Sequence, residues 1–150
     1  KEELKYNFSI SPYIDVSQKN KLSQNKQAGA RKKPERVEGT LSCELPKILV
    51  KKNDIHITSK RNFDCFQDTE LDMLLKRTLN VKNIIICGVN TDTCVYGTTF
   101  GASNRGYNPI VIECCTGSMR GEDQHQTALK IMSQSIAWVM KKEEILNKLN

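Results

Sequence analysis

The chain has 150 residues, a formal net charge of +6, and 38% hydrophobic and 27% charged residues. This length favours one domain with a core of its own, because a chain of this size buries roughly 70% of its unfolded surface. No window approaches the roughly 20 apolar residues of a membrane-spanning helix, which excludes an integral helical membrane protein. No apolar segment follows residues 1–5, so we expect no secretory signal.

The positive charge is concentrated in the first third of the chain. Residues 1–53 hold 12 Lys or Arg and 6 Asp or Glu, whereas residues 54–150 hold 11 of each kind. The basic run between Lys19 and Arg36 could attract nucleic acid, but it contains no aromatic side chain to stack on bases. We therefore predict a solvated, largely irregular arm over residues 1–36 and no nucleic-acid partner.

The cysteines indicate a reducing environment. None of the six forms a Cys-x-x-Cys pair, and Cys114 and Cys115 are adjacent, which suits neither a disulfide framework nor a zinc site. His56 and His125 do not form a spaced pair either. We predict a cytoplasmic protein with no metal and no cofactor.

Strand and helix patterns alternate along the chain. One short strand is expected between Tyr6 and Val16, interrupted by Pro12, and residues 16–40 hold few apolar side chains. Leu and Met side chains predict a helix over 69–79 with Thr69 as its N-cap. Continuous apolar runs predict strands over 83–87 and 108–113 that are buried on both faces. The other predicted elements are strands over 55–58 and 136–140 and helices over 91–105 (ended by Gly106), 123–135 and 143–149.

This alternation predicts an α/β fold: three αβα layers around a mostly parallel sheet, over residues 37–150. In the helix over 123–135, the side facing the sheet is predicted to carry Ala128, Leu129, Ile131 and Met132, followed by Ile136. Chemistry in such folds gathers where the strands end. The loops after residues 58, 87 and 113 are therefore the places to seek a site.

Cys94 follows the strand over 83–87. With Thr91 as the N-cap, Cys94 is the third residue of the next helix, where free amides and the helix dipole favour an anion. A thiolate there is a nucleophile, and the same amides could hold a substrate oxyanion. The alternative is a small buried cysteine at a strand–helix junction.

Lys60 follows the strand over 55–58 and is expected at the same edge of the sheet as Cys94. A cation there would stabilise the thiolate further and could orient a carboxylate. The alternative is an ordinary surface lysine.

Two motifs in the correct order resemble a known family. Gly88–Val95 (GVNTDTCV) resembles the nucleophile motif of the isochorismatase-like cysteine hydrolases, which include nicotinamidases, N-carbamoylsarcosine amidases and ureidoacrylate amidohydrolases. Lys60–Asp72 resembles the Lys…Phe…Thr-x-Leu segment that precedes this motif in the family. The resemblance covers roughly residues 37–150.

The resemblance implies roles for individual residues. Cys94 would be the nucleophile and Lys60 the catalytic lysine. A cis peptide between Val89 and Asn90 would aim the Asn90 amide, together with that of Cys94, at the oxyanion. Phe66 falls where the family has a pocket-lining aromatic, although it could equally be a core residue. The implied reaction is hydrolysis of a small amide or ureido compound through a thioester on the cysteine.

The chain departs from the family pattern before Lys60. The family's general base is an Asp in an Ile-Asp-x-Gln pattern at the end of the first strand, and Asp15 gives only a faint match. The metal ligands of nicotinamidases belong to the same region. A further departure lies after Lys60, where Cys114 stands at a position at which the family usually has an acidic residue. A first βαβ unit is expected to be incomplete. The chain could be a fragment, a degenerate homologue, or an enzyme that uses Asp15 as its base.

Two further expectations follow, together with the alternatives to the main interpretation. A sheet without its first unit exposes strand edges and apolar faces, so we predict a homo-oligomer. Without a positioned base, amidase activity of this chain alone should be weak or absent. The alternatives to an amidase are an isochorismatase-type vinyl-ether hydrolase and a non-enzymatic homologue with a regulatory or oligomerising role.

Overall fold

A computed structural model describes residues 8–10, 41 and 44–149 of the chain. The chain divides into two compact units, one formed by residues 4–61 and the other chiefly by residues 62–150. The predicted boundary between arm and domain at 36/37 lies outside the described residues, as do the basic run and Asp15.

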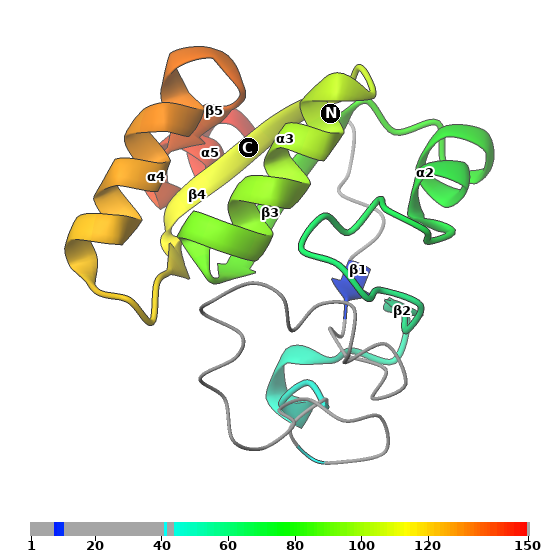
Figure 1. The fold of residues 1–150 in the computed structure, drawn as a ribbon. Helices are drawn as coiled ribbons and strands as arrows, with labels where there is room; N and C mark the ends of the chain where they lie inside the picture. The colour runs from blue at the N-terminus through cyan, green and yellow to red at the C-terminus, as the bar shows by residue number, and fades with distance from the viewer. Residues whose placement is uncertain (1–7, 11–40, 42–43, 150) are drawn as a thin grey trace. The chain divides into compact units, whose positions relative to one another are not determined.

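The described strands of the unit formed by residues 4–61 are a parallel pair. Strand β1 (Phe8–Ile10) lies beside β2 (Ile55–Ile57), with Phe8 opposite Ile55 (Figure 1). A short strand was expected between Tyr6 and Val16, and β1 confirms it over Phe8–Ile10. A 3-10 turn at Lys47–Leu49 precedes β2.

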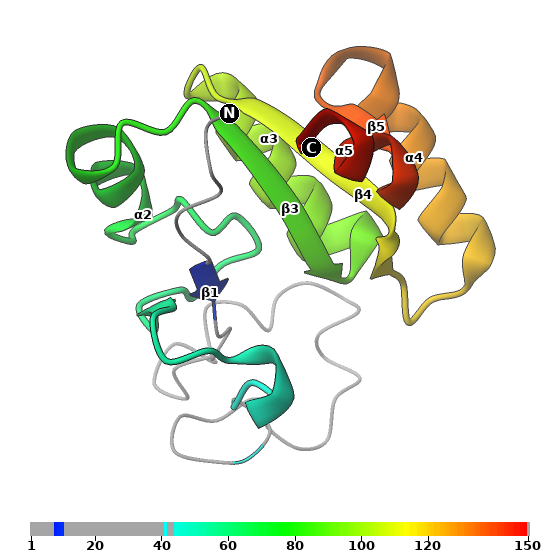
Figure 2. The ribbon, with the colours of Figure 1, turned by 180° about the vertical axis from the view of Figure 1, so that it is seen from behind.

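The larger unit has a three-stranded parallel sheet in the order β3-β4-β5. Its strands are β3 (Asn83–Val89), β4 (Asn108–Gly117) and β5 (Trp138–Met140). Helices α3 (Tyr96–Asn104) and α4 (Glu122–Ser135) cover one face, and α5 (Lys142–Leu149) covers the other (Figures 1 and 2). The predicted αβα layering and parallel sheet are therefore confirmed in this unit. None of the described helices is both long and apolar enough to cross a membrane.

Local sequence explains how the helices pack. Helix α4 buries His125, Ala128, Leu129 and Met132, a spacing that places one helical face on the sheet. Ile131, predicted on that face, is 42% exposed, because it lies outside this stripe.

Helix α3 ends as expected at Gly106. This residue has φ +81°, and the amides of Gly106 and Tyr107 donate to the carbonyls of Ser103 and Ala102. Glycine adopts this left-handed conformation without a steric penalty, which stops the helix and turns the chain into β4.

Several predicted elements differ from those observed. Strand β4 extends four residues beyond its predicted end at residue 113, so the loop expected there begins only after Gly117, and β5 begins two residues later than predicted. The helix expected over 69–79 begins after Glu70 as α2 (Leu71–Met73) and continues as a π-helical turn, Leu74–Thr78. Thr69 is not its N-cap residue. Strand β3 is two residues longer than predicted and only Ile86 in it is buried, so the expectation of burial on both faces is wrong for this strand.

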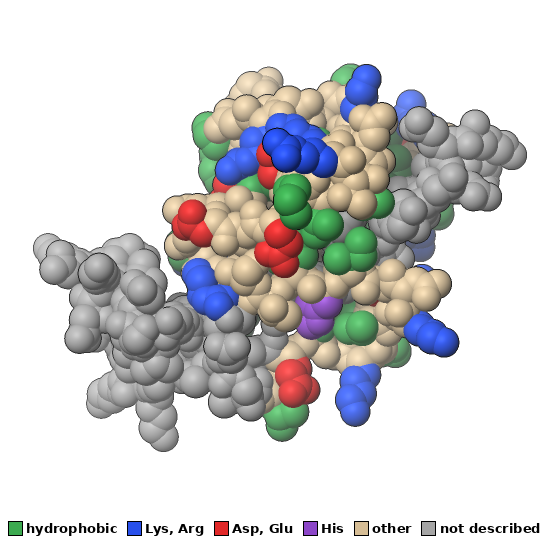
Figure 3. Space-filling model, turned by 90° about the vertical axis from the view of Figure 1, so that its right-hand side faces the viewer, with side chains coloured by type: hydrophobic (Ala, Val, Ile, Leu, Met, Phe, Trp, Pro, Cys, Tyr) green, Lys and Arg blue, Asp and Glu red, His purple; other side chains and the backbone are tan. Residues whose placement is uncertain are grey.

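Several large hydrophobic side chains are exposed in the described part of the chain. Trp138 on β5 is 69% exposed and Met119 is 81% exposed. The space-filling view shows hydrophobic side chains among acidic and basic ones on the face that it presents (Figure 3). Such exposure is compatible with self-association, which stays a prediction.

Candidate active site

The turn that carries Cys94 begins where β3 ends. The Val89–Asn90 peptide is cis, as the family resemblance implies. Asn90 is the N-cap, and a π-helical turn over Thr91–Val95 leads directly into α3. Cys94 is therefore the fourth residue of the helix and not the third, because the N-cap is Asn90 and not Thr91 as predicted.

The Cys94 amide does not donate to the Asn90 carbonyl. The Asn90 carbonyl accepts from the amides of Thr93 and Val95, each at 3.1 Å. In a regular α-helix the Cys94 amide would donate to this carbonyl, but here the bond passes to Val95. The turn therefore leaves the Cys94 amide outside the regular helical pattern, at the end of the helix where backbone donors favour negative charge.

Three side-chain contacts hold the turn to the segment between β4 and α4. The Met119 amide donates to Asn90 Oδ1 at 3.0 Å, so the Asn90 side chain is used for this contact and not for capping. Asp92 accepts from Ser118 Oγ and from Arg120, both at 2.6 Å. Burial works to raise the pKa of Asp92, but these hydrogen bonds and the Arg120 charge outweigh it, and the pKa lies below its ordinary value.

A fourth contact comes from α4 itself. Thr91 Oγ1 lies 2.8 Å from Nδ1 of His125, and both residues are buried. Sequence reasoning missed this role of His125. The available signal was its spacing of three and four residues from Ala128 and Leu129, which places it on the face that packs against the sheet.

The cysteines differ in their surroundings. Cys94 is a half-buried free thiol, whereas Cys65 is buried with its sulfur 3.0 Å from Thr98 Oγ1. Cys87 and Cys115 lie on the neighbouring strands β3 and β4. The pKa of Cys87 is raised to about 11, chiefly because its sulfur is partly buried and to a smaller extent because the Cys115 thiol is near. The residue as a whole is nevertheless exposed.

Lys60 lies three residues after β2, in the unit formed by residues 4–61. Its side chain is 4% exposed, so it is not an ordinary surface lysine. Cys94 belongs to the other unit. The structure therefore describes Lys60 and Cys94 each within its own unit. That Lys60 lies beside the Cys94 thiol stays a prediction.

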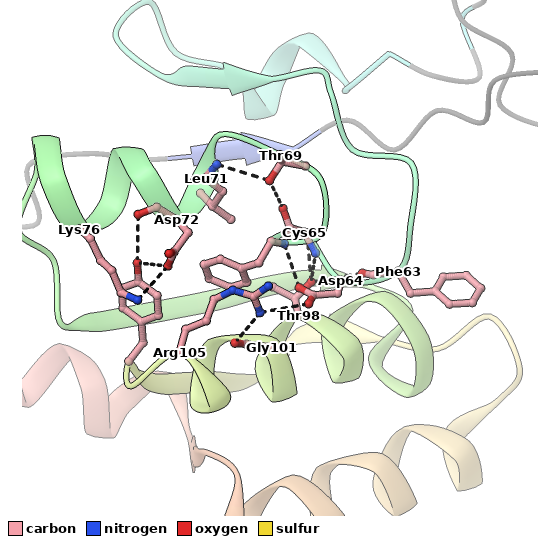
Figure 4. Close-up of polar contacts among 12 residues, drawn as sticks. Phe63, Asp64, Cys65, Thr69, Leu71, Asp72, Lys76, Thr98, Gly101 and Arg105 are labelled. Carbon is pink, nitrogen blue, oxygen red and sulfur yellow. Dashed lines mark hydrogen bonds and ion pairs between the residues drawn. The ribbon is translucent and has the colours of Figure 1, made fainter.

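The segment after Lys60 is docked on α3 (Figure 4). Thr98 Oγ1 accepts from the Cys65 amide at 3.2 Å, and Arg105 donates to Asp64 at 3.4 Å and to the Gly101 carbonyl at 3.0 Å. The Asp64 carboxylate also accepts from the Phe66 amide at 2.8 Å. These contacts fix the residues that follow Lys60 against the helix that carries Cys94.

Phe66 is packed inside this segment. It is 4% exposed, its ring stacks on Tyr107 with centroids 5.5 Å apart, and the Arg105 guanidinium lies 4.9 Å from the ring centroid. Tyr107 in turn donates to Asp72 at 2.8 Å. Of the two expectations for Phe66, these contacts match those of a core residue.

Among the described residues, no group of three or more His, Cys, Asp or Glu side chains is arranged to hold a metal ion.

Comparison with known proteins identifies the family. The isochorismatase domain family model matches residues 12–144, and the chain belongs to this family. The match begins upstream of the resemblance at residues 37–150 and includes Asp15. The chain is 33% identical over 97 residues to YecD, an uncharacterized isochorismatase family protein of Escherichia coli O157:H7. That alignment covers 65% of this chain and 50% of YecD, so the chain spans about half the length of the curated relatives it matches.

Solved structures show the same fold. An isochorismatase-like hydrolase from Alkaliphilus metalliredigens matches with a TM-score of 0.81 at 21% identity, over 97% of this chain and 74% of that one. A pyrazinamidase/nicotinamidase from Streptococcus mutans UA159 matches with a TM-score of 0.74 at 25% identity, over 90% of this chain and 75% of that one.

Proposed function

We propose that the chain is a cysteine hydrolase that cleaves a C–N bond of a small amide or ureido compound, with Cys94 as the nucleophile. The observation that carries this proposal is the turn after β3, where a half-buried thiol lies in the first turn of a helix and the Asn90 carbonyl accepts from Val95 in place of Cys94. The names of the matching structures, a hydrolase and a nicotinamidase, support the same class of reaction.

The reaction has two steps. A base takes the proton of the Cys94 thiol, and the sulfur attacks the substrate carbonyl carbon. The amides of Asn90 and Cys94 donate to the oxyanion of the tetrahedral intermediate. The C–N bond breaks, the nitrogen leaves with a proton as an amine or ammonia, and the acyl group remains as a thioester. Water then adds to the thioester, releases the carboxylic acid and regenerates the thiol.

Lys60 and Asp15 are the charged groups proposed to serve Cys94. Lys60 follows β2 by three residues and Asp15 follows β1 by five, and these strands are adjacent and parallel. The resemblance to the family supports these two assignments. Asp15 is the candidate base within this chain, and its place within the range that the family model matches supports it.

Hydrolysis of nicotinamide, N-carbamoyl amino acids and ureidoacrylate tests the proposal. We expect slow turnover of one of them and trapping of an acyl adduct on Cys94 by mass spectrometry. Cys94→Ala should abolish both, whereas Cys87→Ala, which removes another thiol from the same segment, should leave both unchanged. Asp15→Asn should lower turnover by about 10²–10⁴-fold if it is the base. Turnover that survives Cys94→Ala would refute the proposal.

A further inference from the structure

The nucleophile turn comprises residues 90–95, from Asn90 to Val95. Its contact between Thr91 and His125 is more buried than its contacts with the segment between β4 and α4. Thr91 is 0% exposed and His125 is 7% exposed, whereas the Arg120 side chain bound to Asp92 is 53% exposed. A hydrogen bond shielded from water holds its geometry better than an exposed one, because no solvent molecule competes for the donor and acceptor. The Thr91–His125 contact is thus the buried anchor of this turn.

Thr91 has a special place in the chain. It is the residue directly after Asn90 and three residues before Cys94, and these two supply the amides that the proposed function directs at the oxyanion. Its hydroxyl does not cap the helix and instead contacts His125 of α4. Fixing its side chain therefore fixes the peptide planes on either side of it.

We infer that Thr91 and His125 are positioning residues that hold the oxyanion donors of Asn90 and Cys94 in place. Neither residue needs to touch the substrate. This inference rests on the proposed function, because it assigns a role in stabilising an oxyanion on a substrate carbonyl. Oxyanion donors act only within a narrow range of positions, so a turn that loses its buried anchor should lose rate in acyl transfer more than in other chemistry of the same thiol.

Two reactions of Cys94 separate positioning from general damage. Acylation by p-nitrophenyl acetate passes through a tetrahedral oxyanion and releases p-nitrophenolate, whereas alkylation by iodoacetamide displaces iodide at a saturated carbon and forms no oxyanion. Thr91→Val removes the hydroxyl at nearly constant shape. It should lower the acylation rate about 10- to 100-fold and leave the alkylation rate within about two-fold of wild type.

Conservative variants that keep the Thr91–His125 contact should keep the acylation rate close to that of wild type. Thr91→Ser keeps the hydroxyl and should acylate within about three-fold of wild type. His125→Asn keeps a polar atom at the position of Nδ1, whereas His125→Leu does not, so only the leucine variant should resemble Thr91→Val. Thr99→Val is the matched control, since Thr99 is also 0% exposed on the same helix but donates only to the Val95 carbonyl.

The double variant Thr91→Val/His125→Leu guards against misfolding, because replacing both partners by apolar groups leaves no buried polar group unpaired. If the two residues act as a pair, it should acylate no more slowly than the slower single variant. Equal losses of acylation and alkylation, or unchanged acylation in Thr91→Val, would overturn the inference while leaving the proposed function intact. Wild-type acylation that does not depend on Cys94 would refute the proposed function itself, and with it this inference.

Discussion

Two glycines of α3 offer a direct test of how closely the segment after Lys60 packs on this helix. A methyl group added at Gly97 would meet its nearest neighbours, backbone and side-chain atoms of Phe63 and Asp64, at 3.5 Å, which is ordinary contact. A methyl group added at Gly101 would lie within 2.6 Å of Cγ and Oδ1 of Asp64. The carboxylate is held there by the Phe66 amide, so it has to give up this bond to move away.

The two substitutions gain equally from the higher helix propensity of alanine but differ in the steric cost of the added methyl group. Gly→Ala within a helix stabilises by about 1 kcal/mol at either position, so this gain cancels between them. Overpacking costs about 1–3 kcal/mol, and only Gly101→Ala incurs it. We therefore expect Gly101→Ala to unfold with a free energy about 1–3 kcal/mol lower than that of Gly97→Ala.

Urea denaturation followed by circular dichroism measures this difference. The Asp64→Ala background provides the control, because it removes the carboxylate that the new methyl group meets. In that background the two alanine variants should have nearly equal stability. Equal stability of the two single variants would refute the packing that the structure shows between α3 and residue 64.

Two other predictions concern titrating groups. With its pKa raised to about 11, Cys87 is thiolate in only about one molecule in 10⁴ at pH 7, so iodoacetamide should label Cys94 before Cys87. Peptide mapping that finds Cys87 modified faster would contradict this. The pKa of Asp92 lies below its ordinary value of 3.8, so the contacts of its carboxylate stabilise the folded state. This stabilisation is fully present above pH 3.8 and is lost as the pH falls through the lowered pKa. The stability difference between wild type and Asp92→Asn should therefore shrink between pH 6 and pH 2.5 in urea titrations, and a difference independent of pH would argue against this ion pair.

The order of the elements could be predicted because the signals are local. The apolar run before Gly88 predicts a strand through the pattern of its side chains. The glycine at position 106 predicts the end of a helix, because glycine readily adopts the left-handed conformation found there. The helix over residues 123–135 was predicted to within one residue of α4 at its start, since its apolar spacing is regular. Local rules of this kind suffice for the existence and type of an element.

The details of the site could not be predicted in the same way, because tertiary partners decide them. Thr91 and Asn90 are both good N-caps by residue type. In the folded chain the Thr91 hydroxyl meets His125, which is 34 residues away, and the Asn90 side chain receives the amide of Met119. Neither partner is visible in the turn's own sequence. The helix begins one residue earlier than a Thr91 cap would give, and its first five residues form a π-helical turn.

The burial of His125 also changes how the family motif should be interpreted. Read as a string, GVNTDTCV identifies a nucleophile, and the residues between Asn90 and Cys94 look like spacing. In the structure, Thr91 and Asp92 are the residues through which α4 and its preceding loop hold the turn. The proposed amide donors and the thiol lie on one short stretch of backbone, and oxyanion donors act only in defined positions. Under the proposed function, the side chains of Thr91 and Asp92 therefore have a part in the site as well as the spacing that they provide.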